Sequence, residues 1–235
     1  MSTVASEKSA ARPAESAGSP PGGDGRGDPR IVFRGVGVQV YEALCEATSE
    51  GEHVHLAYDG KDLEIMVVSN LHEIWKERLN KIVTALTLGR RIDYVSCGEA
   101  TYQAPQRGLQ ADLTYYFDPE KIRAVRDAER RESTDPADYP SPDLAIEIDR
   151  SPPQIDRPEI YEALRVSEVW RFSKGPHLII DHLQPDGSYA PAPASRFLHI
   201  RVEEILEWLS AEDVTREAEW HLRLIQWAMG LGRQG

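Results

Sequence analysis

Residues 142–157, which read PDLAIEIDRSPPQIDR, are the feature that most limits how this chain can fold. In a β-strand alternate residues point to opposite faces, so Asp143, Glu147 and Asp149 would share one face. The other face carries only leucine and isoleucine, which predicts packing against a core. Carboxylates are rarely buried unless they are paired or bind a metal. The acidic face is therefore either a ligand site or a polar sheet face open to solvent, and the spacing alone leaves both interpretations open.

The hydrophobic pattern of the whole chain predicts an α/β fold with a mixed central sheet flanked by helices. Apolar residues three or four apart indicate helices, and alternating ones indicate strands. The order combines antiparallel neighbours with at least one strand–helix–strand crossover. We expect a helix at 38–52, a hairpin at 53–68, a long helix at 69–91 that ends at Gly89, strands at 93–104 and 109–118 joined by a turn at Gly108, a charged helix and loop at 118–141, a strand at 143–148, a helix at 158–166, strands at 167–173 and 177–184, and terminal helices at 201–213 and 216–231.

The first 30 residues are rich in Ser, Ala, Gly and Pro, so we expect a disordered tail at 1–30 and a single domain at 31–235. The net charge is -12, and the tail holds equal numbers of acidic and basic residues, so the domain carries the whole excess. That excess of negative charge argues against non-specific electrostatic binding to nucleic acid. The two cysteines are too few for a disulfide framework or a cysteine zinc site, and no segment resembles a membrane span. We expect a soluble, cytoplasmic protein.

A second candidate acid, Asp112, lies in the strand predicted at 109–118. Two acids on neighbouring strands can hold Mg²⁺ through oxygen ligands, with water completing the octahedron. Such an ion can activate a bound water and offset the charge of a phosphate. Asp112 and Glu147 are therefore the candidate metal ligands. Glu64 in the hairpin and His72 at the start of the long helix are further candidates, although a histidine at a helix start more often acts as a cap or dipole partner.

Several motifs together resemble the Uma-type "putative restriction endonuclease" family of the PD-(D/E)XK nuclease superfamily. The run YDGKDLEIMVVSNLHEIWKERLNKIV is similar to the family's hairpin and helix, and RGLQADLTYYF to its Gly-x-x-Pro-Asp strand. PDLAIEID followed by DRPEIYEALRVSEVWRF resembles its later strand and helix, so that the match extends over roughly residues 33–209. The resemblance implies a restriction-endonuclease-like mixed sheet flanked by helices, and an endonuclease that depends on Mg²⁺ or Mn²⁺.

The resemblance also implies roles for particular residues. Asp112 would be the first metal-binding acid, and Glu147 would be the second, shared between the metal and the attacking water. Glu64 matches the family's N-terminal acid and would support the metal indirectly. Asp143 matches a Pro-Asp pair that caps or turns the chain, and His72 matches the histidine that opens the family's helix.

This chain departs from the family pattern at two places. Ala111 stands where a proline usually precedes Asp112, which is a mild change because proline is not a ligand. The superfamily usually has a lysine two residues after the second acid, where this chain has Asp149. Many members instead place a lysine four residues before the helix tyrosine, Tyr161, and that position is Arg157. An arginine can hold a phosphate, but it stays protonated and cannot act as a base.

The leading hypothesis is a metal-dependent endonuclease that hydrolyses DNA, with Asp112, Glu147 and Arg157 as its catalytic residues. The alternative is an inactive or weakly active nuclease-fold protein that binds nucleic acid or a protein partner. The missing lysine and the acidic charge favour that alternative. An RNA substrate also stays open, and the resemblance suggests a homodimer.

Overall fold

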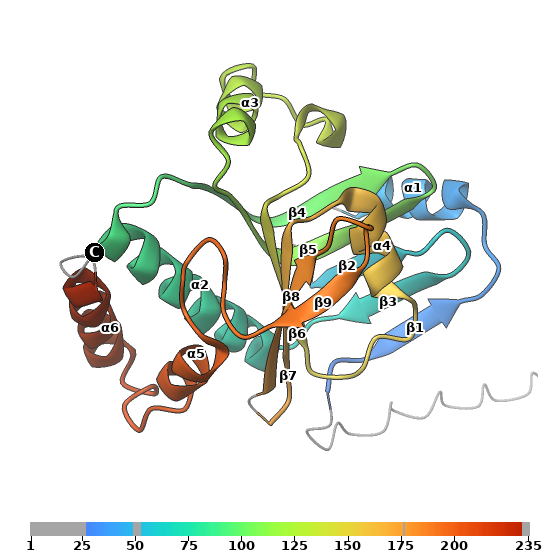
Figure 1. Cartoon of the computed structure of the whole chain (residues 1–235). Coiled ribbons are helices and arrows are strands. Elements are labelled where there is room, and N and C mark those ends of the chain that lie inside the picture. The colour runs from blue at the N-terminus through green and yellow to red at the C-terminus, as the bar shows by residue number, and fades with distance from the viewer. Residues whose placement is uncertain (1–26, 49–52, 176, 232–235) are drawn as a thin grey trace, which may run out of the picture.

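The structure, a computed structural model, describes residues 27–48, 53–175 and 177–231 (Figure 1). Its strands form one sheet in the order β1-β3-β2-β5-β6-β7-β8-β9, with β4 paired to β5. Among the described strands only β6 and β7 pair in parallel. The predicted mixed α/β class is confirmed. The strands are β1 (Arg30–Phe33), β2 (Val54–Tyr58), β3 (Leu63–Val67), β4 (Val95–Ala104), β5 (Arg107–Tyr116), β6 (Leu144–Asp149), β7 (Glu168–Ser173), β8 (His177–Leu183) and β9 (Tyr189–Ala192), and the helices are α1 (Val38–Ala47), α2 (Asn70–Arg90), α3 (Pro119–Arg130), α4 (Arg157–Leu164), α5 (Val202–Leu209) and α6 (Glu217–Leu231).

Most predicted elements lie close to their expected positions. The hairpin is β2 and β3, the long helix is α2, and the predicted crossover helix is α4, which joins the parallel strands β6 and β7. Two strands were not predicted. β1 has only four residues, and β9 contains Pro191, which weakens the strand pattern but is tolerated at the edge of a sheet.

Strand β5 changes its partner along its length, and this change positions Asp112. Its first part pairs with β2, where Gly108 lies opposite Tyr58. Its second part pairs with β6, beginning with Leu113 opposite Ile146. Asp112 therefore lies where β5 leaves one neighbour and meets the next.

Gly108 does not form the predicted turn between β4 and β5. The turn falls at residues 105–106, where Gln106 adopts a left-handed conformation with φ 60. Gly108 lies inside β5, and a Cβ atom there would come within 2.4 Å of the Tyr41 hydroxyl oxygen. The close approach of α1 to the sheet is therefore what requires a glycine at this position.

Helices cover both faces of the sheet, and Figure 1 shows α2, α5 and α6 together on one side of it. These three helices pack over the larger core, to which α6 contributes Trp220 and β6 contributes Ile146. Helices α3 and α4 pack over a second core that contains Ile160 and Ala145. Because Ala145 and Glu147 share one face of β6, the acidic face of this strand turns toward α4. No helix in the described ranges is both long enough and apolar enough to cross a membrane.

The first 26 residues of the predicted disordered tail lie outside the described residues. Residues 27–30 are described, and they contact the domain. Arg30 begins β1, and Asp28 is buried, with its carboxylate against His72 of α2.

Helix α2 begins at a side-chain cap and ends beside α6. The Ser69 hydroxyl accepts a hydrogen bond from the backbone N–H of His72, which satisfies a donor of the first turn. The helix ends at Arg91, which has a left-handed φ of 56, and not at Gly89 as predicted. A Cβ atom at Gly89 would lie 2.4 Å from the carbonyl carbon of Ala228, so this glycine lets α6 approach closely.

The Gly89→Ala protein should be less stable than the wild type by about 1–3 kcal/mol, because the added methyl group would force α6 away from α2. The greater helix propensity of alanine would return at most about 1 kcal/mol. Urea unfolding measures the difference. Gly230→Ala is the matched control, because a Cβ atom there meets nothing within 4 Å. Equal losses of stability in the two variants would contradict the close approach.

Candidate active site

The two acids predicted to form a pair lie on neighbouring strands. The register pairs Leu113 with Ile146, and its next position places Asp112 opposite Glu147. Both side chains are buried, as are all six residues of β6. A polar sheet face open to solvent, one of the two interpretations of this strand, is therefore excluded. The acids have to be stabilised by partners inside the protein.

Glu147 has a cation and a hydroxyl as its partners. Arg157 Nη1 donates to Glu147 Oε2 at 2.7 Å, and the Tyr161 hydroxyl donates to Oε1. Both partners come from α4, which begins at Arg157 after Asp156 caps its N-terminus. The short helix therefore places the guanidinium group and the phenol, one turn apart, over the acidic face of β6.

A second guanidinium group extends this network to the far strands of the sheet. Arg157 Nη2 donates to Glu64 at 2.9 Å, and Arg30 Nη1 lies 2.5 Å from the same carboxylate oxygen. Arg30 also donates to Asp149, from Nη2 at 2.7 Å. The other oxygen of Glu64 accepts the backbone N–H of Gln154. Glu64, predicted as a supporting residue, is thus joined to Glu147 through Arg157, and Asp149 occupies a place within the same network.

Asp112 has a different set of partners, two of which are histidines. His72 Nε2 forms a hydrogen bond of 2.8 Å with Asp112 Oδ1, and His55 Nδ1 lies 3.0 Å from the same oxygen. The other oxygen, Oδ2, accepts the backbone N–H of Ile148 at 2.7 Å. His72, a sequence candidate, therefore contacts the first acid directly.

Each of these imidazole rings has a second carboxylate on its other side. His72 Nδ1 forms a 3.0 Å hydrogen bond with Asp28, and His55 Nε2 lies 3.2 Å from Glu99. Acids and imidazoles thus alternate in the order Asp28, His72, Asp112, His55 and Glu99. No sequence pattern connects three of these residues, because Asp28 lies in the predicted tail and His55 and Glu99 lie on strands whose contact depends on the fold.

Asp143, also predicted as a supporting residue, serves a different part of the molecule. Its carboxylate accepts the backbone N–H groups of Phe117 and Asp118 at 2.7 Å each, and Lys121 lies 2.7 Å away. These contacts fix the start of α3. Glu147 lies four residues further along β6, roughly 13 Å away at the rise of a strand. The contacts of Asp143 support its interpretation as a capping residue.

The surroundings move the pKa values of the two facing acids in opposite directions. Burial raises the pKa of Glu147 to about 7, since the attraction of Arg157 offsets only part of the desolvation and Asp112 adds repulsion. Burial also disfavours the charged form of Asp112, but the contacts with His55 and His72 outweigh it and hold that pKa well below its usual range. Asp112 is therefore the fixed anion of the pair, and Glu147 is the acid that can gain or lose a proton near neutrality.

Solvent reaches the Glu147 side of the network through a pocket of about 300 Å³. Glu147, Asp149 and Arg157 lie in its wall, together with Tyr161 and Arg171. Arg157 Nε has no hydrogen-bond partner among the described residues. One buried donor of this guanidinium group is therefore unused, in the wall of a pocket that a small anionic group could enter.

Arg157→Met should lower the free energy of unfolding by about 3–5 kcal/mol, because it leaves buried carboxylates without their cation. Urea unfolding measures the loss. Adding Glu147→Gln to this variant should recover part of it. Arg107→Met is the matched control: Arg107 pairs with Glu159 at the surface, and its loss should cost less than about 1 kcal/mol. Similar losses at the two arginines would contradict a buried network.

With a chelator present to keep the protein free of metal, the free energy of unfolding should fall as the pH rises above neutrality. Burial opposes protonation of His72, but its hydrogen bonds to Asp112 and Asp28 raise its pKa from 6.5 to about 9. A raised pKa adds stability that is complete below pH 6.5 and is lost as the pH rises through about 9. The urea midpoint should fall over this range in the wild type, and by less in His72→Gln. Equal slopes in the two proteins would show that the His72 pairing adds no stability.

The family comparison agrees with the sequence motifs. A family model described as "Uma2: Putative restriction endonuclease" matches residues 38–216. A solved structure similar to this chain is a "putative nuclease belonging to DUF820" from Anabaena variabilis ATCC 29413. It is 13% identical, the match covers 74% of this chain and 99% of that chain, and the TM-score is 0.49. No curated protein matches this chain.

The family match includes the positions of Glu64, Asp112, Glu147 and Arg157, and it spans more than half of the chain. The chain belongs to the Uma2 family of putative restriction endonucleases.

Proposed function

We propose that this protein is an endonuclease that hydrolyses phosphodiester bonds of DNA with a divalent cation, Mg²⁺ or Mn²⁺. Asp112 and Glu147 bind the cation, and Arg157 binds the phosphate that is cleaved. The observation that carries the proposal is the facing pair of buried acids, one of which shares a pocket wall with Arg157. Membership of the Uma2 family supports the same reaction.

The two acids can accommodate a cation without losing their protein partners. A carboxylate offers about four lone-pair sites. Asp112 uses two of them, toward His72 and a backbone N–H, and has His55 close to a third, whereas Glu147 uses two, toward Arg157 and Tyr161. Each acid therefore keeps at least one lone-pair site, and oxygen donors are the ligands that Mg²⁺ and Mn²⁺ prefer. When bound, the cation would activate a water molecule and offset the charge of the phosphate.

Arg157 supplies the positive charge for the phosphate in this proposal. Its guanidinium group stays protonated at every physiological pH, and Arg157 lies in the wall of the pocket. The same property prevents Arg157 from accepting a proton. Glu147 is the residue of this set that can take up the proton of the attacking water.

A second candidate function is binding without catalysis. The observation that favours it is that Arg157 and Tyr161 engage both oxygens of Glu147, so that a cation already neutralises the second acid. The domain would then hold nucleic acid or a protein partner without cutting it. Arg157→Lys separates the two functions. If the protein only binds because it lacks a catalytic lysine, Arg157→Lys should create metal-dependent cleavage. If the protein is an active enzyme, Arg157→Lys should leave its cleavage rate within about tenfold of the wild-type rate.

Plasmid cleavage by the purified protein tests the enzymatic proposal. The wild type should nick or linearise plasmid DNA with Mg²⁺ or Mn²⁺ and should stop when a chelator is added. Asp112→Asn and Glu147→Gln should each lower the rate by at least about 100-fold, since each removes a charged oxygen ligand of the cation. Glu168→Gln is the control: Glu168 is also fully buried, but it bonds Trp170 and the backbone of Arg196, away from the pair.

Circular dichroism should confirm that the compared variants are folded. Cleavage that survives Asp112→Asn at the wild-type rate would contradict the assignment of Asp112. Absence of cleavage by the wild type on plasmid, linear and single-stranded DNA would leave the binding function in its place.

A further inference from the structure

The alternating chain of acids and imidazoles contains three atoms that converge as metal ligands do. Asp112 Oδ1 lies 2.8 Å from His72 Nε2 and 3.0 Å from His55 Nδ1, and the three atoms lie within 4.8 Å of one another. An ion about 2.1 Å from each ligand would place neighbouring ligand atoms about 3.0 Å apart in an octahedron and about 3.4 Å apart in a tetrahedron. The two separations from Asp112 Oδ1 are close to the octahedral value. All three side chains are almost fully buried, so they can be held rigidly around one point.

His55 provides a second indication that a ligand is expected here. It is only 2% exposed, yet neither of its ring nitrogens makes an aligned hydrogen bond with the described residues. Its Nδ1 is close to Asp112 but is not directed at it as a donor. The contacts of this buried imidazole with Asp112 and Glu99 are close but poorly aligned, so part of its hydrogen-bonding capacity is unused, and an ion bound by its lone pair would use it.

The atoms around these ligands follow the pattern that surrounds metal-bound histidines. A ligating histidine usually turns its other ring nitrogen toward a carboxylate, which fixes the ring and increases its basicity. His72 meets Asp28 in this way, and His55 faces Glu99. The second oxygen of Asp112 is held by the backbone N–H of Ile148, which leaves Oδ1 directed at the histidines.

We propose that His55, His72 and Asp112 bind one transition-metal dication, such as Zn²⁺ or Co²⁺, in preference to Mg²⁺ or Ca²⁺. Two imidazole nitrogens and one carboxylate oxygen suit first-row transition metals, whereas Mg²⁺ and Ca²⁺ take oxygen ligands. Water would complete the coordination. The inference goes beyond the proposed function: it assigns Asp112 Oδ1 to a transition-metal ion held with the two histidines, a site different from the one that Asp112 would form with Glu147 for Mg²⁺ or Mn²⁺.

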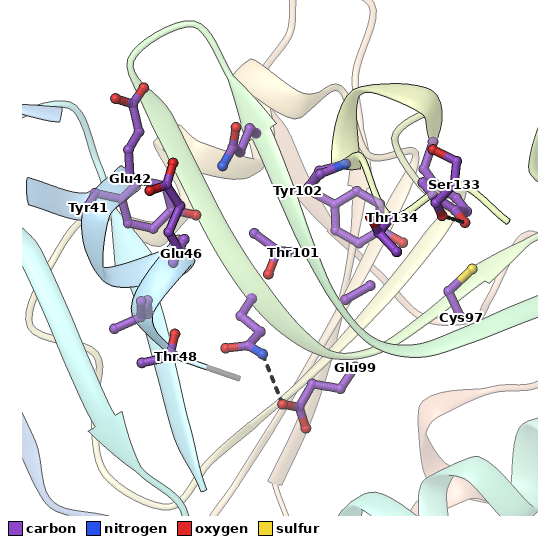
Figure 2. Close-up of a pocket in the computed structure, with 17 residues that line it drawn as sticks. Tyr41, Glu42, Glu46, Thr48, Cys97, Glu99, Thr101, Tyr102, Ser133 and Thr134 are labelled. Atoms are coloured by element: carbon purple, nitrogen blue, oxygen red, sulfur yellow. Dashed lines mark hydrogen bonds between the residues drawn. The ribbon is translucent and has the colours of Figure 1, made fainter. Parts of the chain in front are cut away.

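Figure 2 shows an acidic pocket next to the His55 end of this chain of acids and imidazoles. Glu99, the outer partner of His55, lies in the wall of this pocket, which has a volume of about 770 Å³. Glu42 and Glu46 of α1 lie in the same wall, and no lysine or arginine is among its described lining residues. An acidic pocket attracts cations and repels phosphate groups. The lining of this pocket therefore favours cations over phosphate groups.

Cobalt titration of the chelator-treated, full-length protein tests the site. Visible absorption of bound Co²⁺ reports nitrogen and oxygen ligation independently of any activity. The wild type should bind one Co²⁺ per chain, Zn²⁺ should displace it, and a hundredfold excess of Mg²⁺ should not. His55→Gln and His72→Gln should each weaken Co²⁺ binding by at least about 100-fold, and Asp28→Asn by about 10–100-fold, the usual effect of losing an outer partner.

His182→Gln is the matched control, because His182 lies 3.0 Å from the buried Glu168 but is not part of a converging trio. It should leave Co²⁺ binding unchanged. The proposal is wrong if the wild type shows no Co²⁺ absorption, if Mg²⁺ displaces Co²⁺ at similar concentrations, or if His182→Gln weakens binding as much as His72→Gln. The wild-type spectrum decides the question even if a histidine variant does not fold.

The outcome also separates this inference from the proposed function. Co²⁺ binding without cleavage of any DNA would support the site and contradict the endonuclease. Cleavage with Mg²⁺ and no Co²⁺ binding would support the endonuclease and show that the acids and imidazoles pair without a metal. Glu147→Gln should abolish cleavage and leave Co²⁺ binding intact.

Discussion

The buried ion pairs of Arg30 and Arg157 join parts of the sheet that the strand order separates. β1 and β6 are four steps apart in the order β1-β3-β2-β5-β6, yet Arg30 Nη2 lies 2.7 Å from Asp149 Oδ1. In a flat sheet four steps would separate the strands by about 19 Å. The sheet therefore curls until the edge formed by β1 and β3 turns toward β6 and α4, and the guanidinium groups occupy the space between them. The contacts of Arg30 and Glu64 at the site depend on this closure.

Burial of so many charges explains why the two facing acids behave differently. Asp112 has two imidazoles and a backbone N–H around it, so its negative charge is well supported. Glu147 shares its cation with Glu64 and Asp149, and three carboxylates face only two guanidinium groups. One negative charge in that network has no full partner, which agrees with the raised pKa of Glu147. Two neighbouring acids whose pKa values move apart are a common basis for different roles in catalysis.

The sequence could predict the parts of the site that lie within single elements. Alternation along residues 143–149 predicted the acidic face that holds Glu147. The family resemblance counted Arg157 four residues before Tyr161, and the observed helix starts one residue earlier than predicted and includes both. The pairing of Asp112 with Glu147 followed from motif order rather than from periodicity.

The remaining site residues depend on contacts between distant parts of the chain. Asp28 meets His72 across 44 residues and Arg30 meets Asp149 across 119, and no local pattern contains that information. β1 was missed because its four residues follow a segment without periodicity. Gly89 and Gly108 were assigned to a helix end and a turn, the commonest uses of glycine, whereas the fold uses each for a close approach by another element.

Arg157 both stabilises the buried network and limits the chemistry that the network can perform. A planar guanidinium group can donate to Glu64 and Glu147 from two separate nitrogens, and it keeps a third donor for another group. A lysine would offer one compact charge at a single point. The arginine therefore closes the curled sheet and also faces the pocket, but it has no accessible neutral form. Any proton that leaves the attacking water must go to Glu147 or to solvent, so Glu147 is the residue of this network on which proton transfer at this site would depend.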